Sequence, residues 1–220
     1  ISGIFSMSRV PQWIVPTKAE FTFNTSRLWG KGVLPLETYQ LDYRKLQDVY
    51  PDLKKVDWVR FADIPAYRII EGENERYIDA SGTEVVALNV PQKTIEEGFR
   101  KIHGNDSKMT VTVLEKYDNY YLNLRRTLEL PVYKVEFDDD DHNLYYVNPR
   151  DGYIRYLNKN KIVDKWLFSA IHYLNMGWLV NRPWLWTFCL WFLCIGCGIV
   201  CFTGVVLGVK TWLIRKKKKS

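Results

Sequence analysis

Three histidines and four cysteines are the residues of this 220-residue chain whose types could support catalysis or metal binding. The histidines, His103, His142 and His172, lie far apart in the sequence, and none belongs to an H-E-x-x-H metal motif. The sequence also contains no G-x-S-x-G nucleophile motif and no phosphate-binding loop. It therefore gives little support to hydrolase chemistry, and we expect no catalytic residue and no metal site.

Two of the histidines have simple structural interpretations. His103 precedes Gly104 at the end of an expected helix, where a cation interacts favourably with the helix dipole. His142 follows four aspartates, residues 138–141, whose carboxylates could attract Ca²⁺. An EF-hand, however, needs alternating ligands, a glycine and a distal glutamate. We therefore favour a solvated hairpin loop for this acidic run.

The four cysteines all lie in one apolar segment near the C-terminus. Cys194 and Cys197 form a C-x-x-C pair, but redox chemistry needs an aqueous thiolate, and c-type haem attachment needs a histidine where Gly198 stands. We favour small thiols that pack against other helices. Gly204 and Gly208 form a G-x-x-x-G spacing, which lets another helix approach closely.

An uncharged segment of 26 residues, from Trp184 to Val209, precedes a basic cluster at the C-terminus. As a helix it would be roughly 39 Å long, enough to cross a hydrocarbon layer of about 30 Å. Because basic clusters stay on the cytoplasmic side, we expect a transmembrane helix over 183–214 and a cytoplasmic tail over 215–220. The side chains expected to anchor it at the membrane interface are Trp178, Trp184, Trp186, Trp212, Lys216, Lys217, Lys218 and Lys219.

The net charge of +6 also belongs to this tail. Without its six basic residues, from Lys210 onward, the chain has 25 basic and 25 acidic residues. A body without net charge has no electrostatic basis for holding DNA or RNA, so we exclude nucleic acid as a partner. The part outside the apolar segment has no cysteine, so its stability must come from packing rather than from disulfides.

The region before the apolar segment repeats one plan twice. Residues 64–69 and 130–135 both read aliphatic-Pro-x-Tyr-basic-aliphatic, and each is followed by an aromatic-aliphatic strand and a turn ending in glycine. Helical spacing of apolar residues predicts a helix over 35–50 and another over 91–103. Further strands are expected at 56–61, 85–88, 109–114 and 120–124. The predicted fold class is α+β, with a helix and an antiparallel meander in each of two units.

This order of motifs resembles the PepSY domain and, further along the chain, the PepSY-associated transmembrane family. The resemblance rests on the two Pro-x-Tyr strands, the turn at 148–152, the segment at 166–174 and the Arg182-Pro183-Trp184 sequence before the apolar helix. It implies two tandem PepSY-like units at 35–90 and 91–160, after a linker at 9–34. It also implies an amphipathic juxtamembrane helix at 161–177 and, at 1–8, the end of a preceding transmembrane helix.

The function that the resemblance implies is binding. We expect an inner-membrane protein whose periplasmic or equivalent exterior domain holds a peptide or protein, as a non-enzymatic accessory subunit of a membrane complex. Its partners would then be the membrane, other transmembrane helices and that exterior ligand.

The alternative is a haem-containing electron-transfer subunit, because some members of the family resemble ferric-siderophore reductases of iron uptake. His172 matches the family's aromatic-Leu-His segment, which makes it a candidate axial ligand of a b-type haem. The other interpretation of His172 is a hydrogen-bonding anchor of the juxtamembrane helix at the interface.

Overall fold

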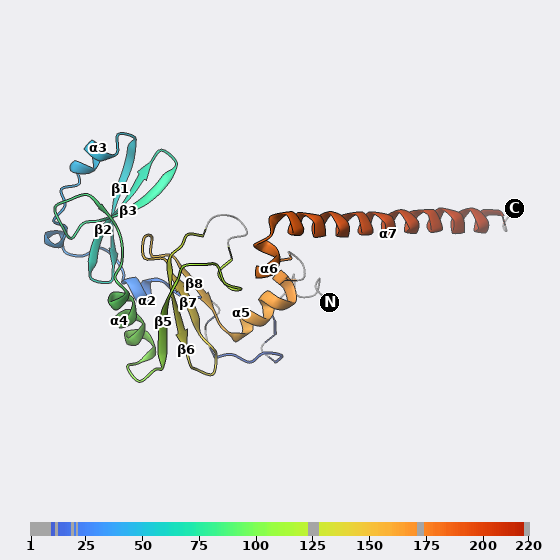
Figure 1. Cartoon of the computed structure of the whole chain (residues 1–220), viewed down its shortest axis with the longest axis horizontal. Helices are drawn as coiled ribbons and strands as arrows, with labels where there is room; N and C mark the ends of the chain where they lie inside the picture. Colours follow the sequence, from blue (N-terminus) through green and yellow to red (C-terminus); the bar gives the residue numbers. More distant parts are fainter. Residues whose placement is uncertain are drawn as a thin grey trace.

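The computed structural model describes residues 10–11, 13–18, 20, 22–122, 128–170 and 174–217, excluding the side chains of 169, 170 and 212–217. The chain is a mixed α+β protein with two antiparallel four-stranded sheets and a long apolar helix at its C-terminal end. The two sheets lie together at one end of the molecule, and the apolar helix extends away from them (Figure 1).

The first sheet joins consecutive strands in chain order: β1 (Leu53–Phe61), β2 (Ile64–Glu71), β3 (Asn74–Asp79) and β4 (Val86–Ala87). Apolar residues alternate along β2 and β3, so that one face buries Tyr67, Ile69 and Ile78 against Leu41 and Leu46. The strands expected at 56–61 and 64–69 are confirmed.

The helix expected over 35–50 is wrong, because only two short helical pieces occur there. They are the 3₁₀ turn η1 (Leu36–Thr38) and the five-residue helix α3 (Lys45–Val49). Between them, the backbone N–H groups of Gln40 and Leu41 both donate to the carbonyl oxygen of Ala80, at 2.8 and 3.3 Å. These long-range bonds use the donors that a continuous helix would need for itself.

The second sheet also joins consecutive strands: β5 (Met109–Leu114), β6 (Val132–Phe137), β7 (Leu144–Val147) and β8 (Ile154–Leu157). The helix α4 (Gln92–His103) precedes it and buries Ile95 and Phe99 against one face. Pro91 and Gly104 flank this helix, as the sequence pattern predicts. The helix at 91–103 and the strand at 109–114 are confirmed, whereas β8 was not expected.

The strand expected at 120–124 is wrong for residues 120–122, and residues 123 and 124 lie outside the described part. The carboxylate of Asp118 accepts hydrogen bonds from the backbone N–H groups of Tyr120 and Tyr121, at 2.9 and 2.7 Å, which bends the chain into a turn. Tyr121 then stacks on Tyr146, with ring centroids 5.1 Å apart. A loop therefore packs on this face of the second sheet.

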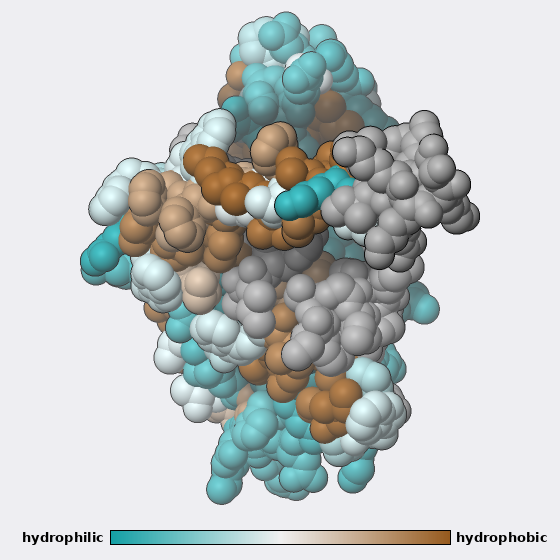
Figure 2. Space-filling model, turned by 90° about the vertical axis from the view of Figure 1, so that its right-hand side faces the viewer, coloured by the Kyte–Doolittle hydropathy of each residue, from teal (hydrophilic) through white to brown (hydrophobic). Residues whose placement is uncertain are grey.

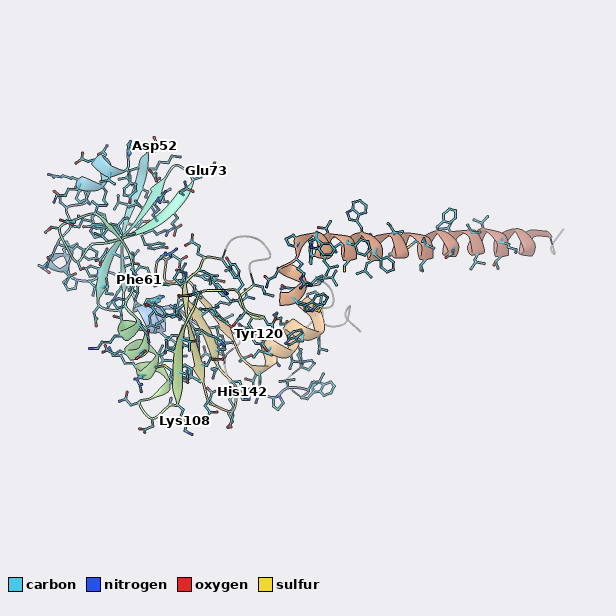
Figure 3. The ribbon with its side chains drawn as sticks, viewed as in Figure 1. Asp52, Phe61, Glu73, Lys108, Tyr120 and His142 are labelled. Carbon is cyan, nitrogen blue, oxygen red and sulfur yellow. The ribbon has the colours of Figure 1, made fainter. Side chains whose placement is uncertain are left out.

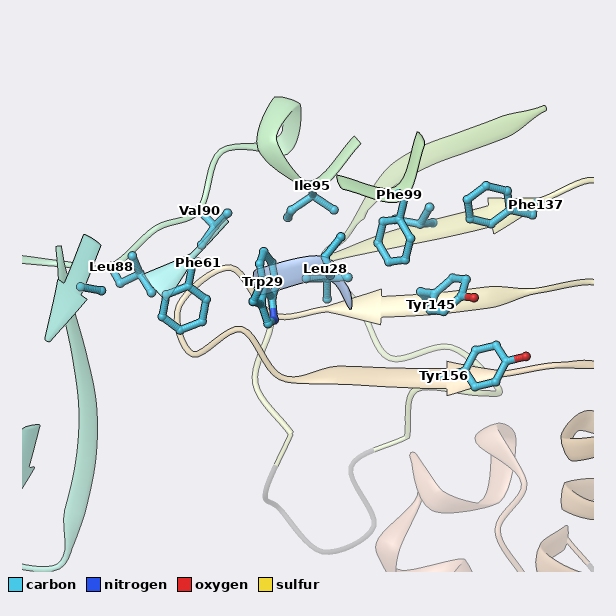
Figure 4. Packing of buried hydrophobic residues seen from close by; sticks show 13 residues of the cluster. Leu28, Trp29, Phe61, Leu88, Val90, Ile95, Phe99, Phe137, Tyr145 and Tyr156 are labelled. Carbon is cyan, nitrogen blue, oxygen red and sulfur yellow. The ribbon is translucent and has the colours of Figure 1, made fainter. Parts of the chain in front are cut away.

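The two sheets share one hydrophobic core (Figure 4). Helix α2 (Ser26–Trp29) contributes Leu28 and Trp29 to it, both almost fully buried. Part of the stretch expected to be a linker at 9–34 therefore belongs to the core. The other large side chains of this core are Phe61, Leu88, Val90, Ile95, Phe99, Phe137, Tyr145 and Tyr156.

The segment expected as a single juxtamembrane helix at 161–177 is divided. It contains α5 (Lys159–Asp164), the π-helix η2 (Lys165–Ala170) and the start of α6 (Gly177–Val180). The Asn158 side chain caps α5 by accepting a hydrogen bond from the Lys161 backbone N–H at 3.0 Å.

The last helix, α7 (Pro183–Lys217), is the one described helix that is long and apolar enough to cross a membrane, over Pro183–Thr211. The apolar part of α7 is not buried against the rest of the described protein. Viewed along α7 from its C-terminal side, hydrophobic residues gather across the middle of the molecule, and hydrophilic ones cover its upper and lower ends (Figure 2).

Candidate functional site

The site residues expected on the C-terminal helices lie apart from the two sheets. Nothing lies within 4 Å of a Cβ atom added at Gly204 or Gly208, so both positions face open space. Trp178 and Trp184 are exposed and Trp186 is partly buried, which places two of the expected anchors on the surface near the start of α7. The expected anchors whose side chains lie outside the described part are Trp212, Lys216, Lys217, Lys218 and Lys219.

The haem alternative falls on a position outside the described residues, because His172 lies there. A b-type haem therefore stays a prediction, and the absorbance of the purified full-length protein after haem reconstitution tests it. A missing Soret band would end the proposal. Among the described residues, no group of three His, Cys, Asp or Glu side chains is placed to hold a metal ion.

His103 is not the cationic helix cap that its sequence position predicts. Its Nε2 lies 3.0 Å from the hydroxyl of Tyr145, and its ring stacks on Phe137 with centroids 4.1 Å apart. Burial lowers the pKa of the imidazole; Arg27 lowers it further and Asp139 opposes both. His103 is therefore a neutral packing residue at pH 7.

The acidic run at 138–141 is only partly the solvated loop expected of it. Asp138 is exposed, with 77% of its side-chain area accessible. Asp141 is buried, and its carboxylate accepts hydrogen bonds from the backbone N–H of Lys18 at 3.1 and 3.2 Å and lies 3.3 Å from Lys159 Nζ. The last aspartate of the run thus ties the N-terminal segment and α5 to the second sheet.

The strongest candidate site is a cleft of about 610 Å³ between the two sheets. Its floor is the face of the first sheet opposite α3, which presents Arg68, Glu75 and Tyr77 beside the apolar end of β1. Its other wall is the turn between β7 and β8, with Asp151 and Tyr153. This volume falls in the range of about 300–1,000 Å³ that is typical of ligand pockets.

A close contact between the first sheet and the β7–β8 turn fixes the width of this cleft. Phe61 lies where the sheets meet (Figure 3), and a Cβ atom at Gly152 would overlap its ring. Gly152 has φ of +67°, a backbone conformation that glycine adopts without steric cost. The indole N–H of Trp29 donates to the Gly152 carbonyl oxygen at 2.8 Å, and the Val90 N–H donates to that of Pro149 at 2.8 Å. The β7–β8 turn is thereby held over the end of the first sheet.

The charges on the floor of the cleft largely neutralise one another. Arg68 Nε lies 3.0 Å from Glu75 Oε1, and Arg68 Nη1 lies 4.0 Å from Asp57 Oδ2. The hydroxyl of Tyr77 also donates to Glu75, at 2.6 Å. This hydrogen bond, together with Arg68 and against the effect of burial, holds the pKa of Glu75 below its usual value. Burial, reinforced by the same hydrogen bond, raises the pKa of Tyr77.

Asp151, the carboxylate on the opposite wall, has a raised pKa, unlike Glu75. Burial raises the pKa of Asp151, and Glu129 adds to the rise, against hydrogen bonds from the Tyr153 backbone N–H at 2.8 Å and from Asn148. Within the described part of the chain, no lysine, arginine or histidine nitrogen lies within 4.0 Å of this carboxylate. Asp151 is therefore a cleft-lining acid without a cationic partner there.

The arrangement of the cleft supports binding. Its described lining residues include no serine, cysteine, histidine or lysine. It does present aromatic surface, fixed ion pairs and, in Asp151, a carboxylate without a cationic partner among the described residues, which together suit an amphipathic ligand. No family model, no curated protein and no solved structure matches the chain.

Proposed function

We propose that this chain is a membrane-anchored binding protein of PepSY type, whose two sheets hold a peptide segment of a partner protein on the exterior side of the membrane. The helix α7 is its anchor, with the basic C-terminal tail on the cytoplasmic side. Two consecutive four-stranded meanders, each with the same Pro-x-Tyr pattern within or at the start of its second strand, support the PepSY assignment. In this role the chain is an accessory subunit of a membrane complex.

The main support for a binding function is the cleft between the two sheets. It is built jointly by the two units, through β1–β3 of the first and the β7–β8 turn of the second. A ligand in the cleft would touch both sheets, which gives the paired architecture a use that neither sheet has alone. The contact of Gly152 with Phe61 keeps the two walls in place before the ligand arrives, and such preorganisation lowers the entropic cost of binding.

Site-specific photocrosslinking in membranes tests this function. The crosslinking amino acid p-benzoylphenylalanine is placed at Tyr153, on the rim of the cleft, and in a second variant at Val113 on β5. The two side chains are almost equally exposed, at 49% and 52%, but Val113 is not among the residues that line the cleft. We expect a discrete protein adduct from position 153 and none from position 113.

The crosslinked peptide, identified by mass spectrometry, is then synthesised and its binding to the purified full-length protein is measured. The proposal is supported if this peptide binds the unmodified protein and does not bind the protein whose position 153 is already crosslinked to the partner segment. Equal adducts at 153 and 113, or adducts at 113 alone, would mean that the cleft is not the binding site. No adduct at either position would count against the binding function.

A further inference from the structure

We infer that the ligand of the cleft inserts a positively charged group, an ammonium or guanidinium carried on an alkyl stem, as in a lysine or arginine side chain of a partner's peptide, beside Asp151. This inference rests on the proposed function, since it names the chemistry of the segment that the cleft holds. Three features of the described residues support it. The arginines in the cleft are already paired with acids, Asp151 has no cationic partner among these residues, and the surface between them is apolar.

The two arginines in the cleft already have partners. Arg68 is held by Glu75 and Asp57, as described above. Arg60 donates from Nε to the carbonyl oxygen of Ala62 at 2.8 Å, and its Nη2 lies 3.6 Å from Asp63 Oδ1. Because these acids already balance the arginine charges, an anionic ligand would have to displace an existing ion pair.

Among the residues that the structure describes, no cationic side chain compensates Asp151 in this way. A charged side chain that does act on it is another acid, Glu129, and that carboxylate already lies 3.6 Å from Arg150 Nη1. Neither hydrogen bond to Asp151, from the Tyr153 backbone or from the Asn148 amide, brings a positive charge. A partly buried carboxylate in this situation interacts favourably with a cation that enters the cleft, because burial weakens the screening by water.

The surface between the two walls suits the stem of such a side chain. Val59, Phe61 and Tyr77 of the first sheet and the ring of Tyr153 line the same cleft as Asp151. Lysine and arginine bury their methylene stems along apolar surface while the charged head reaches a polar group, and aromatic faces attract the cation itself. The charge and the apolar lining thus select the same kind of ligand.

Peptide binding to the full-length protein in lipid nanodiscs tests the inference. The probes are fluorescent pentapeptides of sequence Ala-Phe-X-Phe-Ala with blocked ends, in which X is lysine, arginine, norleucine or glutamate. Spermidine serves as a cation without a peptide backbone. We expect the lysine and arginine peptides to bind about tenfold more tightly than the norleucine peptide, and the glutamate peptide to bind most weakly.

Two matched variants locate the effect. Asp151→Asn keeps an acceptor for the Tyr153 N–H but removes the charge, and we expect it to abolish the preference for lysine over norleucine. Asp138→Asn removes the same charge from an exposed position at the β6–β7 turn and should leave the preference intact. Thermal unfolding of both variants confirms that they are folded.

The remaining outcomes overturn the inference in distinguishable ways. A lysine preference that survives in Asp151→Asn, equal binding of the lysine and norleucine peptides, or no binding by any probe would each refute it. The proposed function would still stand if crosslinking at position 153 held. Asp151-dependent binding of spermidine without binding of any peptide would assign the cleft to a small polyamine and exclude a peptide side chain as its ligand.

Discussion

Burial gives individual residues of this protein properties that their positions in the sequence do not indicate. His103 stands at the end of a helix, where a charged imidazole would be favourable, yet its ring is enclosed between Phe137 and Tyr145. The cost of burying a charge exceeds the benefit of the helix dipole here, so the pKa of His103 falls. The same reasoning explains why Asp151 and Lys165 are displaced in the direction of their neutral forms.

The lowered pKa of His103 predicts a loss of stability in mild acid. In the unfolded chain an imidazole has a pKa of about 6.5. Because the folded state binds this proton more weakly, the free energy of unfolding should fall as the pH drops below that value. Thermal unfolding between pH 5 and 7.5 measures it, and His103→Asn should flatten the profile. His142→Asn changes an exposed histidine and should keep the slope; a slope unchanged in His103→Asn would contradict the assignment.

The lowered pKa of Lys165 predicts that stability also rises with pH in alkaline solution. The side chain is only 6% exposed, and its ammonium has no hydrogen-bond partner among the described residues. It lies 4.9 Å from the ring centroid of Tyr120 and 5.2 Å from that of Trp166. Burial, reinforced by Arg155 and opposed by Asp118, lowers its pKa to about 8. The folded state therefore binds this proton more weakly, and stability should rise from about pH 8 to the unfolded value of about 10.4.

Replacement of the lysine tests this explanation. Lys165→Met should raise the free energy of unfolding at pH 7 by about 1 kcal/mol, since it removes a buried unsatisfied donor, and should abolish the gain above pH 8. Denaturant unfolding at pH 7, 8.5 and 10 gives both quantities. Lys93→Met, at a side chain that is 85% exposed on α4, serves as the control and should change neither. Loss of stability in Lys165→Met would show that the charge itself holds η2 in place.

At the level of elements, the sequence pattern predicts the strands and helices that are stabilised by interactions between residues close in the chain. Apolar alternation located β2 and β5, and the Pro91 and Gly104 signals located α4. The helix at 35–50 was mispredicted because Ala80, far along the chain, takes the N–H groups of Gln40 and Leu41. The cleft could not be predicted either, since it requires two turns some ninety residues apart to meet. Only the glycine in the 148–152 motif indicated an unusual backbone there.

The contact between Gly152 and Phe61 predicts that one added methyl group has a large effect on stability. Gly152→Ala should lower the free energy of unfolding by about 2–4 kcal/mol, because it adds a Cβ at positive φ and forces that atom into the Phe61 ring. Gly72→Ala is the matched control: its φ is +60°, but no atom lies within 4 Å of the added Cβ. It should cost only the backbone contribution, about 1 kcal/mol.

Denaturant unfolding of the two variants separates the contributions. The difference between them measures the steric contact between the units, independently of the shared effect of positive φ. Gly152→Ala should in addition weaken the crosslink at position 153, because the turn moves off the first sheet. Equal destabilisation by the two variants would mean that the Gly152–Phe61 contact does not hold the cleft.

At the level of the whole molecule, charge and apolar surface are distributed differently between the body of the chain and the helix α7. The body of the chain carries equal numbers of basic and acidic residues, and the excess positive charge lies beyond the apolar part of α7. The side chains of that part are mostly exposed, including Phe188, Trp191 and Phe202 at 63%, 66% and 71%. So long a stretch of apolar surface is costly in water and is typical of a helix surrounded by lipid or by other helices.

This arrangement predicts the orientation of the chain in the membrane. If α7 crosses the bilayer with its lysines on the cytoplasmic side, both sheets lie outside. The four cysteines of α7 are replaced by alanine, and a single cysteine is introduced at Lys108, whose side chain is 84% exposed, or at Ser220. In intact cells a membrane-impermeant maleimide should label position 108, and position 220 should react only after permeabilisation. The reverse pattern would place the cleft in the cytoplasm and refute exterior binding, and labelling of both positions in intact cells would show that α7 does not cross the membrane.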